Sequence, residues 1–288
     1  MKYTTLIFMI LFLLGCGTPK KEEAKPSRNI LVSILPQKTF VEKIAGDDFK
    51  VNVLIPPGTS PATYSLTPSQ MAEIANSPMW FRIGYIGFEL SWKDKIAEIN
   101  PKMKIVDLSE ELNLIQTQIN NGETLKTGTD PHTWLSPALV KEMAAKILKE
   151  LSDLNPDQSV KYKTNYLEFV KEIDQLDIEI RKLLADYSGR KIITFHPSLS
   201  YFARDYGLEQ HSLESGGKEP TPQRMAELAK LAKKENIKAI YIQGELDREQ
   251  ARVFAEETKG EVVQVRPLDP AWEENLLEMT RIFVKNFQ

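Results

Sequence analysis

The chain has 288 residues, of which 42% are hydrophobic, enough to build a packed core in one or two domains. Its 37 Lys and Arg residues and 40 Asp and Glu residues give a formal net charge of −3. The chain therefore lacks the basic excess that would predict binding to nucleic acid. The single cysteine, Cys16, excludes a disulfide within the chain and a metal site built from several thiolates.

The N-terminal segment has the pattern of a secretory signal. Lys2 precedes an uncharged apolar run over residues 6–14, which is shorter than the roughly 20 residues needed to cross a bilayer. The run ends in Leu-Gly-Cys and resembles the bacterial lipobox, in which cleavage before the cysteine exposes a thiol for lipid attachment. We therefore expect residues 1–16 to be a lipoprotein signal peptide with Cys16 as the lipid anchor. The alternative is an ordinary cleaved signal with an unused cysteine.

Residues 17–28 have a different composition from the rest of the chain. They carry mixed charge and two prolines, with almost no apolar side chain to bury, which predicts a flexible tether. A tether behind a lipid anchor would let the folded part reach a neighbour on the same membrane. We expect the folded part to begin at residue 29.

From residue 29 onward, short apolar segments alternate with helical patterns. The apolar segments are rich in Val and Ile and bounded by turn residues, which predicts buried strands. They are NILVSIL, VNVLI, WFRIG, KIVDL, KIITF, KAIYI and EVVQV. Three helices begin with Thr or Ser followed by Pro, at Thr67, Ser136 and Thr221. Such alternation predicts an α/β fold with parallel sheets covered by helices.

The middle of the chain departs from this alternation of strands and helices. Residues 157–187 contain neither Gly nor Pro, and their apolar residues recur at steps of three and four. This spacing predicts one helix of roughly 30 residues, about 45 Å long. The helix could cover one large domain, but we favour two α/β lobes joined by it. The expected boundaries are 29–155 for the N-terminal lobe, 156–188 for the bridging helix and 189–288 for the C-terminal lobe.

Two histidines and one aspartate follow predicted strands or precede predicted helices. His196 directly follows KIITF, His132 lies in DPHTWLSP before a helix start, and Asp269 follows EVVQV in RPLDP. Ligand sites in parallel sheets lie beyond the carboxyl ends of the strands. Two imidazoles and a carboxylate would suit zinc or another divalent ion that prefers nitrogen and oxygen ligands. The residues alone leave open whether these three side chains share a metal or serve only to cap helices and pack in the fold. His211 lies within an alternating segment and is expected to pack or to lie at the surface.

Six segments resemble the zinc and manganese solute-binding proteins of ABC transporters. In order and spacing they are PPGTSPATYSLTPSQ, WFRIGYIGFE, DPHTWLSP, FHPSLSYF, KEPTPQ and RPLDP. The resemblance covers about residues 29–288 and implies two α/β lobes bridged by one long helix, with the metal between them. It places His132 and His196 on two metal-binding histidines and Asp269 on the carboxylate ligand. Manganese-binding relatives often have a carboxylate at the position of His196, so the resemblance favours zinc, with manganese or another divalent metal as the alternative.

The first loop departs from this family pattern. The family has Pro-His-x-Tyr, whereas residues 61–64 read Pro-Ala-Thr-Tyr, so Ala62 replaces a histidine ligand. Three outcomes remain open: three protein ligands with water completing a tetrahedron, a substitute ligand, or loss of metal binding in favour of another cargo. The candidate substitutes are His211, Gln37 and Glu89.

The function that the resemblance implies is capture of zinc and its delivery to a membrane permease. Such a protein performs no catalysis, and we expect a monomer at the cell surface or in the periplasm. The first alternative is a metal-dependent hydrolase, although the sequence has no His-Glu-x-x-His, P-loop or Gly-x-Ser-x-Gly pattern. The second is a relative with a non-metal cargo or a role in adhesion, which the replacement at Ala62 would favour.

Overall fold

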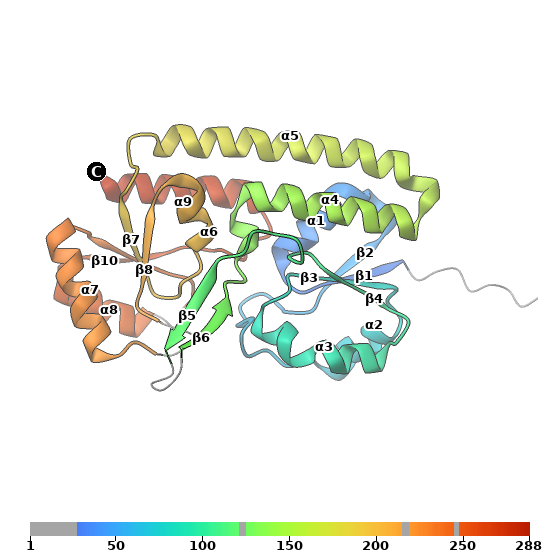
Figure 1. Ribbon diagram of the computed structural model, residues 1–288, viewed down its shortest axis with the longest axis horizontal. Helices are drawn as coiled ribbons and strands as arrows, with labels where there is room; N and C mark the ends of the chain where they lie inside the picture. The colour runs from blue at the N-terminus through green and yellow to red at the C-terminus, as the bar shows by residue number, and fades with distance from the viewer. Residues whose placement is uncertain (1–27, 121–124, 215–218, 245–247) are drawn as a thin grey trace, which may run out of the picture.

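The computed structural model describes residues 28–288 except 121–124, 215–218 and 245–247. The predicted signal peptide, Cys16 and nearly all of the predicted tether lie outside the described residues. Within these residues, the chain forms two lobes, each with a four-stranded parallel sheet and helices (Figure 1). This confirms the predicted fold class. None of the helices described is both long enough and apolar enough to cross a membrane.

The N-terminal lobe is built on the first four strands of the chain. The sheet has the order β2-β1-β3-β4, and all its pairings are parallel. Its strands are β1 (Asn29–Val32), β2 (Lys50–Val53), β3 (Met79–Arg82) and β4 (Lys104–Asp107). Its helices are α1 (Leu35–Ala45), α2 (Pro68–Ala75) and α3 (Gly87–Ile99), with a 3₁₀ turn at Gly46–Asp48.

The C-terminal lobe repeats this topology. Its sheet has the order β10-β9-β7-β8, so in both lobes the first strand lies between the second and the third. The strands are β7 (Lys191–Thr194), β8 (Glu209–Ser212), β9 (Ala239–Ile242) and β10 (Glu261–Gln264). The helices are α6 (Ser200–Tyr206), α7 (Pro222–Glu235), α8 (Arg248–Thr258) and α9 (Trp272–Phe287). The winding direction reverses at β1 and β7, and ligands bind at the carboxyl ends of strands at such reversals.

Most local predictions agree with these elements. Each of the seven predicted apolar segments overlaps a strand. The side-chain oxygens of Thr67, Ser136 and Thr221 each accept the backbone N–H three residues later, as the predicted helix starts require. The sequence pattern did not predict the antiparallel hairpin of β5 (Gln116–Asn120) and β6 (Leu125–Thr129), which leads into the 3₁₀ turn Thr133–Leu135 and α4 (Pro137–Leu154).

Helix α5 (Ser159–Leu184) is the predicted bridging helix. It has 26 residues, or about 39 Å at 1.5 Å per residue, and runs over both lobes in Figure 1. It is shorter than predicted at both ends, because Pro156–Gln158 forms a separate 3₁₀ turn before it and the helix stops at Leu184. Its buried residues form one face and are Tyr162, Phe169, Ile173, Leu176, Ile180 and Leu184.

The two lobes share a packed core beneath α5. Trp272 of α9 meets Phe40 of α1 edge to face, with ring centroids 5.1 Å apart, and Phe169 of α5 lies 6.4 Å from the same indole. The indole N–H of Trp272 donates to the carbonyl of Trp134 (2.7 Å), and that of Trp134 donates to the carbonyl of Pro267 (2.8 Å). Elements from both ends of the chain are therefore fixed to one another by buried aromatic rings, each of which costs several kcal/mol to displace.

This shared core predicts that the lobes move little when a ligand binds between them. A hinge needs a few residues that absorb large changes in φ and ψ, whereas a continuous helix over a common core resists them. We expect the radius of gyration measured by small-angle X-ray scattering to agree within error for the zinc-loaded and zinc-free protein. A clear compaction on adding zinc would contradict the prediction, and excess chelator should return the loaded sample to its starting curve.

Candidate metal-binding site

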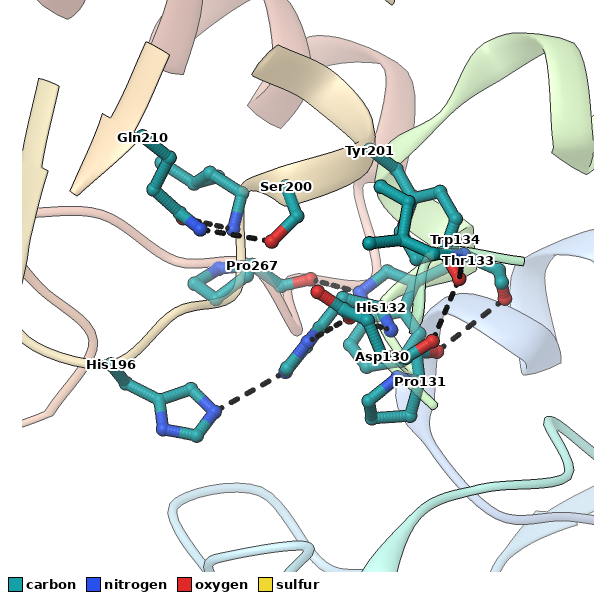
Figure 2. Close-up of polar contacts among 12 residues, drawn as sticks. Asp130, Pro131, His132, Thr133, Trp134, His196, Ser200, Tyr201, Gln210 and Pro267 are labelled. Atoms are coloured by element: carbon teal, nitrogen blue, oxygen red, sulfur yellow. Dashed lines mark hydrogen bonds and ion pairs between the residues drawn. The ribbon is translucent and has the colours of Figure 1, made fainter. Parts of the chain in front are cut away.

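His132 lies between the hairpin and α4, and a carboxylate fixes its position (Figure 2). Oδ1 of Asp130 accepts the backbone N–H of His132 (2.9 Å) and lies 2.8 Å from its Nδ1. Asp130 is buried, and its backbone carbonyl accepts the hydroxyl of Tyr201 (2.8 Å). The ring of Trp134 lies 5.1 Å from the imidazole. Asp130 therefore both caps the turn and holds the ring of His132.

His196 lies at the carboxyl end of β7, as the sequence predicted. The backbone N–H of Phe195 donates to the carbonyl of Tyr241 in β9 (2.8 Å), so the strand pairing continues to the residue before His196. Nδ1 of His196 lies 2.7 Å from Oε2 of Glu214, which follows β8. The His196 side chain is 34% exposed, against 12% for His132.

The two imidazoles face each other across the lobes, with their Nε2 atoms 3.3 Å apart (Figure 2). Each ionised carboxylate can only accept, so each Nδ1–H donates a hydrogen bond to it, and in the neutral ring Nε2 carries a lone pair. Two facing lone pairs repel unless a cation lies between them. In a tetrahedral zinc site with Zn–N bonds of 2.0–2.1 Å, two ligand nitrogens are about 3.3 Å apart. The observed separation of 3.3 Å therefore matches the spacing that two histidine ligands of a single metal would need.

Burial keeps the imidazole of His132 neutral. Burial lowers the pKa of His132 from its ordinary value of 6.5, although the neighbouring Asp130 acts in the opposite direction. Burial would raise the pKa of Asp130, but the hydrogen bonds that it accepts from the ring and the backbone of His132 act in the opposite direction, and the pKa is lowered. At neutral pH the site thus holds a neutral imidazole supported by an ionised carboxylate, as histidine ligands of metals commonly are.

Asp269 lies in the loop between β10 and α9. Its Oδ1 accepts the backbone N–H of Ala271 (2.9 Å), its Oδ2 lies 3.4 Å from Nη1 of Arg266, and its side chain is 17% exposed. Across the part of the chain that the structure describes, no three His, Cys, Asp or Glu side chains form a group that could hold a metal. The structure brings His132 and His196 together, and Asp269 as the third ligand stays a prediction.

Of the three residues considered as substitutes for the missing histidine, Gln37 and Glu89 are engaged elsewhere. Gln37 is buried and bonds to backbone groups of its own lobe through both its amide oxygen and its amide nitrogen. Glu89 is fully buried, accepts the backbone N–H groups of Ile83 and Gly84, and has its pKa raised by burial. His211 lies within β8, as its alternating segment predicted.

Ala62 itself is exposed on a loop that is held against the start of α3. The carbonyl of Pro61 accepts the backbone N–H of Phe88 (2.9 Å). A Cβ atom at Gly87 would lie 2.8 Å from the carbonyl oxygen of Ala62, so only glycine permits this close approach. The backbone at position 62 is therefore fixed although its side chain contributes no ligand.

Glu214 is the site residue that sequence reasoning missed. No motif contains it, and the residues that follow it at 215–218 are not described. The one available signal was its position two residues after the last residue of a strand, at the same edge of the sheet as His196.

Comparisons with known proteins agree with this fold. The family model described as zinc-uptake complex component A, periplasmic, matches residues 30–288. A crystal structure of ZnuA superposes with a TM-score of 0.84 at 34% identity, covering 91% of this chain and 100% of that chain. A Chlamydia trachomatis protein provisionally named a metal-binding protein is 31% identical over 240 residues, covering 82% of this chain and 83% of its own. The high-affinity zinc uptake system protein ZnuA of Bacillus subtilis is 26% identical over 247 residues, covering 81% and 77%.

Proposed function

Because the chain belongs to the ZnuA family of zinc-uptake components, we propose that it captures zinc between its two lobes and delivers it to an ABC-transporter permease. The observation that carries the proposal is the pair of Nε2 atoms 3.3 Å apart, each opposite a carboxylate-bonded Nδ1. Two imidazoles held in this way suit zinc better than a hard cation such as Mg²⁺ or Ca²⁺. No bond of the cargo is made or broken, so the protein acts as a binding component and not as an enzyme.

We propose a ligand set of His132, His196 and Asp269, with water at the position that Ala62 leaves open. Three protein ligands and one water make a complete tetrahedron around zinc. For Asp269 to bind, its carboxylate has to give up part of its contact with Arg266, which lies at 3.4 Å and is exposed. Because the guanidinium of this pair is exposed to water, the pair contributes on the order of 1 kcal/mol, and zinc coordination can replace it.

We further propose that a lipid on Cys16 anchors the chain and that residues 17–28 form the tether. A bound ion then has to travel only from the lobes to a permease in the same membrane. Tight attachment requires two acyl chains or one chain with a second signal, and a diacylated cysteine supplies this. The likeness to zinc-binding relatives supports zinc as the cargo, and manganese is the competing divalent metal.

Metal content and isothermal titration calorimetry of the purified protein test the proposal. One zinc per chain is expected, with manganese binding more weakly in a parallel titration. Tighter binding of manganese would overturn zinc as the cargo. Failure to bind either metal would show that the fold is retained with another cargo.

Zinc affinity is expected to fall as the pH is lowered below about 6.5, because protons then compete with zinc for imidazole nitrogen. The folded-state pKa of His132 lies below 6.5, so in the zinc-free protein the unfolded chain takes up this proton first. The free energy of unfolding is therefore unaffected by this group above pH 6.5, and it decreases progressively as the pH drops from 6.5 toward the lowered pKa of His132. Calorimetry and thermal unfolding at pH about 7.5, 6.5 and 5.5 check both trends. An affinity that is constant across this range would contradict imidazole ligation.

A further inference from the structure

The environments of the two histidines differ in how firmly each ring is held. His132 is 12% exposed and packs against Trp134, and Asp130 bonds both its ring and its backbone. His196 is 34% exposed, and among the described residues Glu214 is the one side chain that bonds its Nδ1. The orientation of His196 therefore depends on a single carboxylate.

Backbone hydrogen bonds between the segments that follow β7 and β8 place Glu214 beside His196. The N–H of Leu213 donates to the carbonyl of Thr194 (2.9 Å), and the N–H of Glu214 donates to the carbonyl of Phe195 (2.9 Å). The β7–β8 pairing thus extends past the last strand residues and places Glu214 beside His196. Its side chain is mostly buried, which limits the water that could compete for the 2.7 Å contact.

We propose that Glu214 is the positioning residue of the metal site. Its carboxylate accepts a hydrogen bond from the Nδ1–H of His196, fixes the tautomer, and points the Nε2 lone pair toward His132 and the ion. The inference rests on the proposed zinc function and adds to it a group that does not itself bind zinc. Partners of this kind, which orient a metal-binding imidazole, typically change metal affinity by about 10- to 100-fold.

The binding test compares Glu214→Ala and Glu214→Gln with Glu209→Gln. Glu209 is a matched control because it lies on β8 and its carboxylate is exposed, 3.9 Å from Nζ of Lys191. We expect Glu214→Ala to weaken zinc binding by about 10- to 100-fold. Glu214→Gln should lose less zinc affinity, because its amide oxygen can still accept a hydrogen bond from Nδ1–H. Glu209→Gln should bind as the wild type does.

A second measurement determines the tautomer of the His196 ring in zinc-free protein. Nitrogen-15 NMR at a pH where the ring is neutral should show the His196 proton on Nδ1 in the wild type. In Glu214→Ala it should show a mixture that includes the Nε2-protonated form, a change that a loss of stability alone would not produce. If Glu214→Ala fails to fold, Glu214→Gln and its smaller shift decide the question.

The outcomes separate this inference from the proposed function. A folded Glu214→Ala variant with wild-type affinity and wild-type tautomer overturns the positioning role while the zinc function stands. A wild-type protein that binds no zinc overturns the proposed function, and the NMR comparison then still decides whether Glu214 sets the tautomer of His196.

Discussion

Replacing both His132 and His196 by alanine is expected to abolish zinc binding. Their Nε2 atoms lie 3.3 Å apart, the spacing that two neighbouring corners of the proposed zinc tetrahedron require. Without them, Asp269 and water remain, and a single carboxylate holds zinc weakly in water. We expect the affinity to fall by at least about a thousandfold, which corresponds to about 4 kcal/mol. Titration calorimetry of the double variant beside the wild type measures this change.

The fold should survive the double substitution. Asp130 keeps the backbone N–H of residue 132 as a partner, so its buried carboxylate does not become isolated. His196 is partly exposed, so its removal leaves little empty space in the core. His211→Ala provides the control, because it removes the third histidine of the chain from a strand in the same lobe. Equal zinc binding by the wild type and the double variant would contradict the proposed site, whereas loss in His211→Ala would indicate a general effect of removing imidazoles.

The α/β lobes could be predicted because their signals are local. The apolar segments and the Ser-Pro and Thr-Pro helix starts each depend on a few adjacent residues. Helix α5 was found from its periodicity, but its first turn was misjudged because Pro156 begins a 3₁₀ turn that the spacing of apolar residues cannot reveal. Hairpin β5–β6 lacks a run of apolar residues, so nothing in its pattern predicted strands.

The site was only partly predictable, because it depends on which strands become neighbours. His196 could be found from its position at a strand end, and Asp130 from its proximity to His132 in the sequence. The contact of Glu214 with His196 requires β8 to pair with β7 at the edge of the sheet, and no local pattern determines that order. The contacts of Asp269 with Arg266 and Ala271 depend on the conformation of a loop, which composition does not specify.

Changing Ala62 to histidine is expected to strengthen zinc binding. The family resemblance places a histidine ligand at this position, and the loop backbone is already fixed by Gly87 and by the bond from Phe88 to Pro61. A new imidazole would replace a bound water and add no large ordering cost to the backbone. We expect about a 10- to 100-fold gain in affinity, or about 1.4 to 2.8 kcal/mol.

The comparison variant for this gain is Thr63→His, which places the same imidazole on the adjacent exposed residue. If only Ala62→His binds zinc more tightly, the open coordination position faces Ala62, and the chain works with three protein ligands and water. The visible absorption of cobalt, used in place of zinc, should then change with the replacement of oxygen by nitrogen in the Ala62→His protein alone. Equal affinities for the wild type and both variants would mean that the first loop does not reach the ion, so its fourth ligand would have to come from another part of the chain.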